Sequence, residues 1–233
     1  FKSFRDEVEL SFEAYNNDTN NSVVTMPDGV KLLRFAVILG PNASGKSNLL
    51  EAIEFLRQFW NELPLKNDAG TDVQPFLMQP DALNHNTEFD VKMYVDGLRY
   101  WYQLEVNPEK VVSENLSVYL SNRPTKIFSR GDVNGISKIT FNPAVVKLTP
   151  AEIDVMSISC LRNMSLLAVL KKVNVEVAYV DNLRKWIDSK MMPLQRGTET
   201  SISQSVKSML SDNEAFKEYL MQFAKEADFN ISD

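Results

Sequence analysis

The sequence has few of the residues that build redox or metal centres. It contains one cysteine, Cys160, and one histidine, His85, among 233 residues. A single cysteine excludes both an intrachain disulfide and a zinc site built on cysteines. His85 lies in the polar stretch Asp81–Thr87, and we interpret it as an exposed loop histidine.

Long hydrophobic runs and an excess of positive charge are also missing. No apolar run approaches the ~18 residues of a membrane span, and no signal peptide is recognisable, so we predict a cytoplasmic protein without membrane association. The net charge of −6 and the pI near 5.0 argue against a basic surface along the whole chain. DNA binding at a local patch stays open. The chain begins with Phe1 rather than Met, so we expect that a segment precedes it.

Glycine is scarce as well, with 8 residues, yet two of them bracket one motif. Residues 40–47 fit G-x-x-x-x-G-K-[ST], the P-loop that holds the β- and γ-phosphates of a nucleotide. The apolar run Leu32–Leu39 before the motif predicts a strand that is buried on both faces. After the motif, apolar residues recur at helical spacing: Leu49, Ala52, Ile53, Leu56, Phe59 and Trp60. A glycine-rich turn with a capping serine would not require the Lys-Ser pair, so we predict a nucleotide site.

The residue types in the loop assign its chemistry. Gly40 and Gly45 let the backbone turn tightly and approach phosphate closely. The amides from about Asn42 to Asn48 would form a nest at the positive end of the helix dipole. Lys46 would place a charge beside the β- and γ-phosphates, and the Ser47 hydroxyl would ligate Mg²⁺. The residue types therefore predict a bound nucleotide together with Mg²⁺, and the resemblance described below makes ATP the expected nucleotide. The predicted binding residues of the loop are Gly40, Pro41, Asn42, Ala43, Ser44, Gly45, Lys46, Ser47 and Asn48.

The middle of the chain predicts antiparallel strands. Phe89–Val95 alternates apolar and polar residues, Asp96-Gly97 is a type I′ hairpin signal, and Leu98–Val106 returns. Shorter strands are expected over 111–120, 126–129 and 138–141. The adjacent Tyr100, Trp101 and Tyr102 could form a base-stacking platform, but aromatic residues are common in strands and no Lys or Arg alternates with these.

Helices are predicted toward the C-terminus. Thr149–Glu152 and Ser211–Glu214 both fit a capping box. Helices are expected over 161–173, 175–191, 202–210 and 215–227, and a half-exposed strand over Val8–Phe12. We therefore divide the chain into a P-loop core (1–63), a β-rich subdomain (64–148) and a helical segment (149–233).

Two groups of motifs resemble known ATPases. Phe1-Lys2-Ser3-Phe4-Arg5, together with the P-loop and the following Asn48–Ile53, resembles SMC-like and RecF-like ABC ATPases. Val95–Tyr100 and Ile127–Arg130 resemble bacterial AAA-type ATP-binding proteins of the abortive-infection and phage-defence group. The resemblance implies a mixed α/β fold: a P-loop NTPase lobe of ABC type with an antiparallel β-subdomain and a C-terminal helical segment.

The resemblance also implies a function and partners. It implies ATP binding and hydrolysis, a homodimer formed through ATP-bound heads, and a nuclease or effector partner in phage defence. It places Lys2 and Ser3 near the nucleotide and Asn42 over the γ-phosphate. Ala43 stands where many ABC proteins have glycine, a change that the AAA-type group tolerates.

The chain departs from this family in its hydrolytic motifs. No Leu-Ser-x-Gly signature occurs. Val177–Asn182 resembles a Walker B strand, with Asp181 as a magnesium residue, but Asn182 replaces the catalytic Glu, and Val180, Leu183 and Ile187 fit a helix better. The catalytic residues are therefore unassigned, and the simplest interpretation is the N-terminal portion of a longer ATPase.

Two other function classes stay open. One is a P-loop kinase or GTPase-like enzyme, although the guanine motif Asn-Lys-x-Asp does not occur. The other is an interaction module that nucleotide only stabilises.

Overall fold

A computed structural model describes residues 1–14, 22–64, 70–133, 136–194 and 213–226. The chain divides into two compact units, Phe1–Met192 and Pro193–Asp233. The second unit contains the helix α6 (Glu214–Glu226) in its described part. The predicted helix over 202–210 and most of the second capping box lie outside the described residues. The boundaries proposed at residues 63 and 148 stay an interpretation of the sequence.

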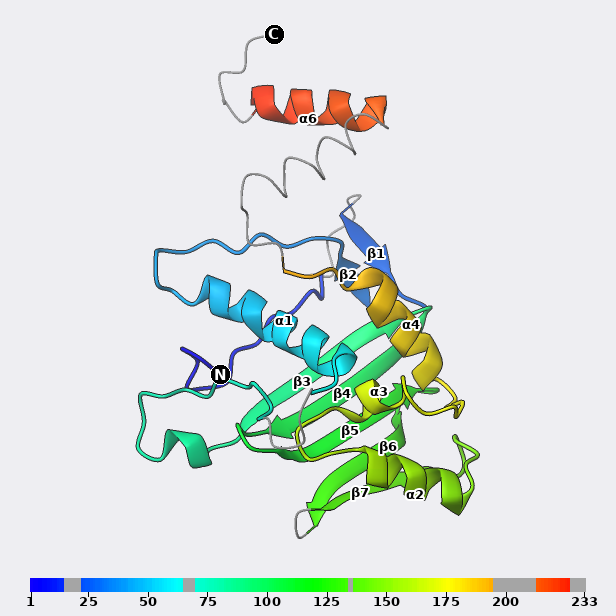
Figure 1. The fold of residues 1–233 in the computed structure, drawn as a ribbon. Helices are drawn as coiled ribbons and strands as arrows, with labels where there is room; N and C mark the ends of the chain where they lie inside the picture. Colours follow the sequence, from blue (N-terminus) through cyan, green and yellow to red (C-terminus); the bar gives the residue numbers. More distant parts are fainter. Residues whose placement is uncertain (15–21, 65–69, 134–135, 195–212, 227–233) are drawn as a thin grey trace. The chain divides into compact units, whose positions relative to one another are not determined.

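The first unit is mixed α/β and is built on a five-stranded antiparallel sheet (Figure 1). Its strands are adjacent in chain order: β3 (Thr87–Val95), β4 (Leu98–Val106), β5 (Val111–Tyr119), β6 (Pro124–Val133) and β7 (Ile136–Phe141). Asp96 and Gly97 both have positive φ, 49° and 80°, as a type I′ turn requires. The predicted antiparallel block is therefore confirmed, and its strands at 126–129 and 138–141 are longer than predicted.

Four helices accompany the sheet in the described part of the first unit: α1 (Lys46–Asn61), α2 (Pro150–Ser159), α3 (Leu166–Val169) and α4 (Val180–Lys190). The predicted capping box at the start of α2 is present, because Thr149 accepts from the Glu152 amide and Glu152 accepts from the Thr149 amide. The helices predicted over 161–173 and 175–191 are too long. Ser165 is the N-cap of α3, so this helix begins only at Leu166. The second helix, α4, begins at Val180, directly after Tyr179, whose φ is 69°.

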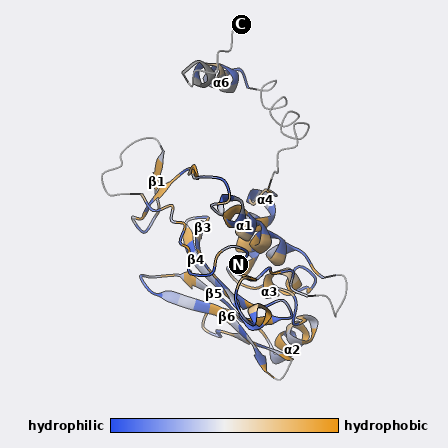
Figure 2. Cartoon of the chain, turned by 90° about the vertical axis from the view of Figure 1, so that its left-hand side faces the viewer, coloured by the Kyte–Doolittle hydropathy of each residue, from blue (hydrophilic) through white to orange (hydrophobic). Residues whose placement is uncertain are grey.

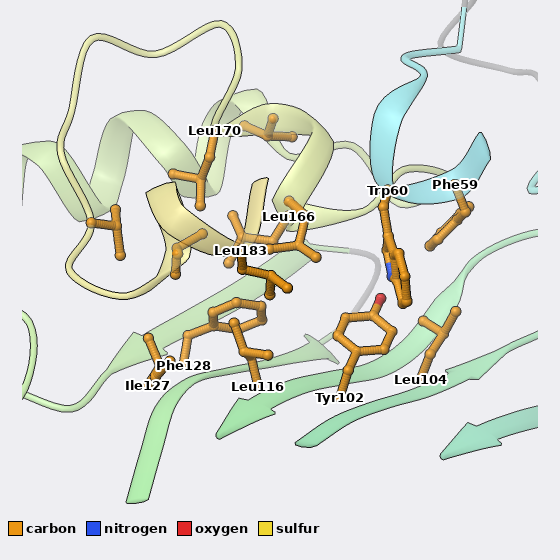
Figure 3. Close-up of a cluster of buried hydrophobic side chains, with 14 of the residues drawn as sticks. Phe59, Trp60, Tyr102, Leu104, Leu116, Ile127, Phe128, Leu166, Leu170 and Leu183 are labelled. Atoms are coloured by element: carbon orange, nitrogen blue, oxygen red, sulfur yellow. The ribbon is translucent and has the colours of Figure 1, made fainter. Parts of the chain in front are cut away.

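The hydrophobic core lies between these helices and one face of the sheet (Figure 3). Tyr102 of β4 meets Trp60 of α1 edge to face, with ring centroids 5.0 Å apart. Leu116 and Phe128 lie beneath Leu166 and Leu183, and all four are fully buried. The hydrophobic colour of α3 in Figure 2 marks the short helix that fills the centre of this layer. Strand periodicity therefore directs alternate side chains to the core.

This periodicity separates the three consecutive aromatic residues of β4. Tyr100 and Tyr102 are fully buried, whereas the Trp101 indole donates to the Asp90 carboxylate at 2.7 Å on the other face. Burial raises the pKa of Tyr100 to about 12. The three rings therefore form no common stacking platform. His85 is exposed at the end of the 3₁₀ turn η1 (Ala82–Asn84), as predicted.

A buried ion pair joins the sheet to α3. Glu114 accepts from the Arg130 guanidinium at 3.2 Å, the Ser165 hydroxyl at 2.7 Å and the Leu166 amide at 2.9 Å. The Tyr102 hydroxyl also donates to Glu114, at 3.0 Å. The carboxylate therefore accepts a hydrogen bond from a backbone amide at the start of α3 that has no partner within the helix.

A smaller hairpin, β1 (Val23–Thr25) and β2 (Lys31–Leu33), is joined to the sheet by polar contacts. The Tyr94 hydroxyl donates to Asp28 at 2.6 Å, and this bond lowers the pKa of the Asp28 carboxyl. The Arg99 guanidinium lies 3.9 Å from Asp28 and packs over the Tyr119 ring, 5.0 Å from its centroid. The hairpin is therefore held beside the turn that joins the end of β3 to the start of β4.

Two predicted strands do not form. Val8–Phe12 is irregular, and only an isolated bridge from Glu13 to Leu32 follows it in the described part of this region. β2 ends at Leu33, so most of the predicted strand Leu32–Leu39 is irregular as well. Phe35, Val37 and Leu39 are 66%, 71% and 85% exposed. The prediction of burial on both faces is wrong here, because among the described residues no backbone hydrogen bond joins 35–39 to a neighbouring strand.

Candidate nucleotide site

Residues 40–45 turn the chain from the irregular segment into α1. Gly45 precedes the helix with a φ of 90°, a conformation that L side chains rarely adopt. A Cβ on Gly45 would lie 3.0 Å from the Phe4 ring, and one on Gly40 would lie 3.0 Å from the Ser44 hydroxyl. The two motif glycines therefore occupy positions where a side chain would be strained or crowded.

The remaining loop residues are exposed to solvent: Pro41, Asn42, Ala43 and Ser44. Ala43 has a φ of 64°, in the left-handed region that favours glycine. The sequence resemblance predicts that many ABC proteins have glycine at this position, and Ala43 adopts a backbone conformation that glycine adopts more readily. Strained residues of this kind gather at ligand-binding loops.

The Lys46 side chain folds back over the loop. Its ammonium donates to the carbonyls of Gly40 at 2.7 Å and Pro41 at 2.6 Å, and lies 3.5 Å from the Ser44 hydroxyl. These neutral oxygens are weaker partners for an ammonium than phosphate oxygens, because a bond between two ionised groups is about twice as strong. Lys46 is therefore positioned on the loop and can exchange its carbonyl partners for an anion.

The first turn of α1 offers free amides. The first intrahelical bond at this end runs from the Leu49 amide to the Gly45 carbonyl at 3.0 Å. The amides of Lys46, Ser47 and Asn48 precede that bond and have no intrahelical partner. The first turn contains no acidic residue, so the positive end of the helix dipole is not neutralised. A helix of 16 residues with this start is suited to bind phosphate.

Ser47 fits the metal role that the sequence assigns to it. Its hydroxyl makes no side-chain hydrogen bond to another described residue. A hydroxyl is a hard oxygen ligand, which Mg²⁺ accepts, but Mg²⁺ at nucleotide sites relies on the phosphates and water for its other ligands. The described residues contain no group of three or more His, Cys, Asp or Glu that could hold a metal by themselves. A magnesium ion would therefore bind here together with the nucleotide.

The two N-terminal residues that the resemblance implies lie beside α1. The Lys2 ammonium pairs with the Glu51 carboxylate, and the Ser3 hydroxyl accepts from the Asn48 side-chain amide at 2.7 Å. Both partners belong to the first two turns of α1, next to Lys46 and Ser47. The structure thus brings Lys2, Ser3 and Asn48 to the start of the same helix as the loop.

Sequence reasoning missed two residues of this region. Phe4 packs against the position of Gly45, and Glu51 pairs with Lys2. In the sequence, both residues belong to the stretches that resemble SMC-like ATPases, and nothing there indicates which residues they contact. A glutamate five residues after Lys46 carries no signal of its own, because its partner lies 49 residues earlier in the chain.

Asp181 lies in the first turn of α4 rather than at the end of a strand. Its carboxylate accepts from the Val177 amide at 3.1 Å and from Arg184, one turn later, at 3.3 Å. Val180, Leu183 and Ile187 are buried on one face of that helix. The helical interpretation of this stretch is confirmed.

Comparison with known families assigns the central part of the chain. Residues 35–149 match the family described as "AAA domain, putative AbiEii toxin, Type IV TA system". The match supports an AAA or P-loop ATPase family and a P-loop NTPase fold, and this family suggests ATP-binding ATPase activity. No curated protein and no solved structure matches the chain. No helix in the described ranges is long and apolar enough to cross a membrane.

Proposed function

We propose that residues 40–48 bind the phosphates of ATP with Mg²⁺, as the nucleotide site of an ABC-type, SMC-like ATPase. The arrangement at the start of α1 carries the proposal. Three amides without intrahelical partners, an ammonium on the loop carbonyls and a serine hydroxyl meet within three consecutive residues, Lys46 to Asn48. Each group is suited to a different part of a metal–polyphosphate complex.

Each residue of the site has a defined task. The amides of Lys46, Ser47 and Asn48 donate to phosphate oxygens, and Lys46 moves its ammonium from the Gly40 and Pro41 carbonyls to the β- and γ-phosphates. Ser47 holds the metal, which when bound neutralises charge between these phosphates. Gly40 and Gly45 keep the backbone free of side chains that would block the approach.

Hydrolysis and assembly are further parts of the proposal. The sequence contains no Leu-Ser-x-Gly signature, and the hydrolytic groups are unassigned. In the complete ATPase, two ATP-bound heads would form a homodimer, with each P-loop facing the signature of the other. We also propose a role in phage defence, to which the AbiEii toxin in the family description points. An effector or nuclease partner is a further part of this proposal.

Calorimetry with Mg-ATP tests the site. Wild-type protein should bind Mg-ATP, and Lys46→Ala should lose most of this affinity, because it removes the charge that faces the phosphates. Lys147→Ala is a matched control, since Lys147 also donates its ammonium to a backbone carbonyl, that of Pro143 at 2.8 Å, away from the loop. Equal affinity of wild type and Lys46→Ala would reject the site.

Competition separates the alternatives within P-loop proteins. We expect ATP to displace a fluorescent ATP analogue and GTP to compete more weakly. A preference for GTP would instead favour the GTPase-like alternative, although the sequence lacks its guanine motif.

A further inference from the structure

The N-terminal segment Phe1–Phe4 packs along the start of α1 (Figure 1). We call it the N-terminal brace. Phe1 anchors the brace in the core, with its ring centroid 6.1 Å from Phe55 of α1 and 5.6 Å from Phe89 of β3. From this anchor, Lys2, Ser3 and Phe4 each reach a different residue of the helix or its loop.

The backbone of the brace is held in an unusual conformation. Lys2 has a φ of 48°, in the left-handed region that costs energy for any residue but glycine. Its amide donates to the Gln74 carbonyl at 2.8 Å, and its ammonium pairs with Glu51. Both ends of Lys2 are therefore fixed, and the strained conformation directs Ser3 and Phe4 toward the P-loop.

Ser3 and Phe4 contact the turn that carries the site. Ser3 bonds to the side chain of Asn48, the residue directly after Ser47. Phe4 packs against Gly45, the residue directly before Lys46. The contacts thus enclose Lys46 and Ser47 between two fixed neighbours. Gly45 is the N-cap of this helix and has no side chain to cap it, so the brace contacts are side-chain support at this helix start and leave its first amides free.

We propose that Ser3 and Phe4 are positioning residues, which fix the first turn of α1 so that Ser47 is oriented to hold the metal of Mg-ATP. The inference rests on the proposed function. It differs from direct nucleotide contact, because the observed contacts of these side chains are with α1: Ser3 accepts from Asn48, and Lys2 pairs with Glu51. Mg²⁺ demands near-ideal octahedral geometry, whereas backbone amides tolerate small shifts of a phosphate oxygen. Losing the Ser3–Asn48 bond should therefore weaken metal-dependent binding first.

The test compares the affinity for ATP with Mg²⁺ and with EDTA, by calorimetry on the whole chain. Ser3→Ala should bind Mg-ATP about three- to tenfold more weakly, which corresponds to one lost hydrogen bond, with metal-free binding changed by less than about twofold. We call the affinity for Mg-ATP divided by the affinity for metal-free ATP the affinity ratio. Ser3→Thr keeps the hydroxyl and should restore the wild-type affinity ratio. Ser47→Ala removes the proposed ligand itself and sets the largest change in the ratio that the assay can show.

A matched control and a double mutant isolate the contact. Ser121→Ala likewise removes a serine hydroxyl that accepts one hydrogen bond, here from the backbone amide of Arg123 in the turn after β5. This control should leave both affinities unchanged. Asn48→Ala should reduce the ratio as Ser3→Ala does, and the double mutant Ser3→Ala/Asn48→Ala should reduce it no further, because the two side chains act as one contact.

The outcomes separate the inference from the function on which it rests. Wild-type protein that fails to bind Mg-ATP rejects the proposed function and this inference with it. Normal wild-type binding with an unchanged ratio in Ser3→Ala rejects the inference alone. Equal loss of both affinities, accompanied by a lower melting temperature, would show a merely structural role and also reject it.

Discussion

Replacing Glu114 by glutamine should destabilise the protein more than any surface substitution of the same kind. Glu114 is fully buried, and the Arg130 side chain beside it is 1% exposed. Glu114→Gln would keep the size of the side chain and remove its charge, which leaves the guanidinium buried without a counter-ion. The new amide group would also face the donors Leu166 N–H and Ser165 O–H. Breaking one partner of a buried pair costs about 3–5 kcal/mol.

That cost is large relative to the whole stability of a domain. A free energy of unfolding of ~5–15 kcal/mol is usual, so Glu114→Gln would remove a third or more of it in many cases. For a unit of this size, each kcal/mol lowers the melting temperature by about 2–4 °C, so we expect a decrease of about 6–20 °C. Urea unfolding followed by circular dichroism measures the free energy directly.

Two further variants make the measurement decisive. Glu88→Gln is a matched control on β3, where the side chain is exposed, and should change stability by less than about 0.5 kcal/mol. In the double mutant Glu114→Gln/Arg130→Met the unpaired charge is gone, so the loss should be smaller than the sum of the two single losses. The reasoning is refuted if Glu114→Gln matches Glu88→Gln, or if the two single losses simply add.

Two other predictions concern pH and turnover. Burial raises the pKa of the Cys160 thiol from 9.0 to about 12, so the unfolded chain loses this proton at a lower pH than the folded chain does. The free energy of unfolding should therefore fall as pH rises from about 9 to about 12, and Cys160→Ala should delay this fall when urea midpoints are measured. A wild-type midpoint that is constant to about pH 11 would contradict the burial of the thiol. Residues 1–233 should release phosphate from ATP at background rate, because they lack a signature serine; turnover on the order of 1 s⁻¹ that disappears in Lys46→Ala would show a missed catalytic residue.

The sheet could be predicted because its signals are local. Leu98–Val106 has the predicted bounds, and the Asp96-Gly97 turn fixes its register against β3. Helix positions were harder, since 161–173 is apolar enough for a helix but contains only the short α3. There the buried Glu114 carboxylate, 52 residues away in sequence, sets the start of the helix by accepting from Leu166 N–H. The Ser165 cap is a local signal, but no local pattern reports that a carboxylate from another strand accepts from the Leu166 amide.

The eight residues of the motif predict the turn that leads into α1, but they do not predict the contacts that support this turn. The spacing of the apolar residues from Leu49 to Trp60 predicts one buried stripe along α1. Only the C-terminal part of this stripe is buried, and Ile53 is 42% exposed. Phe55, which the predicted stripe does not include, is also buried. The N-terminal half of α1 is instead held by polar contacts to the brace, which come from residues 45 and 49 positions earlier. The sequence shows these residues as a family motif and shows nothing of their pairing.

The exposed segment before the loop determines how firmly the site is held. A P-loop is ordinarily held from both sides, by a buried strand before it and a helix after it. Here α1 is anchored in the core through Phe59 and Trp60, whereas Phe35, Val37 and Leu39 present apolar side chains to solvent and their backbone has no strand partner among the described residues. Exposed backbone groups without a partner, beside apolar side chains, are places where a strand can add by pairing. The loop is therefore fixed at its helical end by α1 and the N-terminal brace. Gly40 and Pro41, at the other end, would be held equally well only if segment 35–39 paired with a strand. Nucleotide affinity should accordingly depend on Ser3 and Phe4 more strongly in these 233 residues than in a form whose segment 35–39 lies inside a sheet.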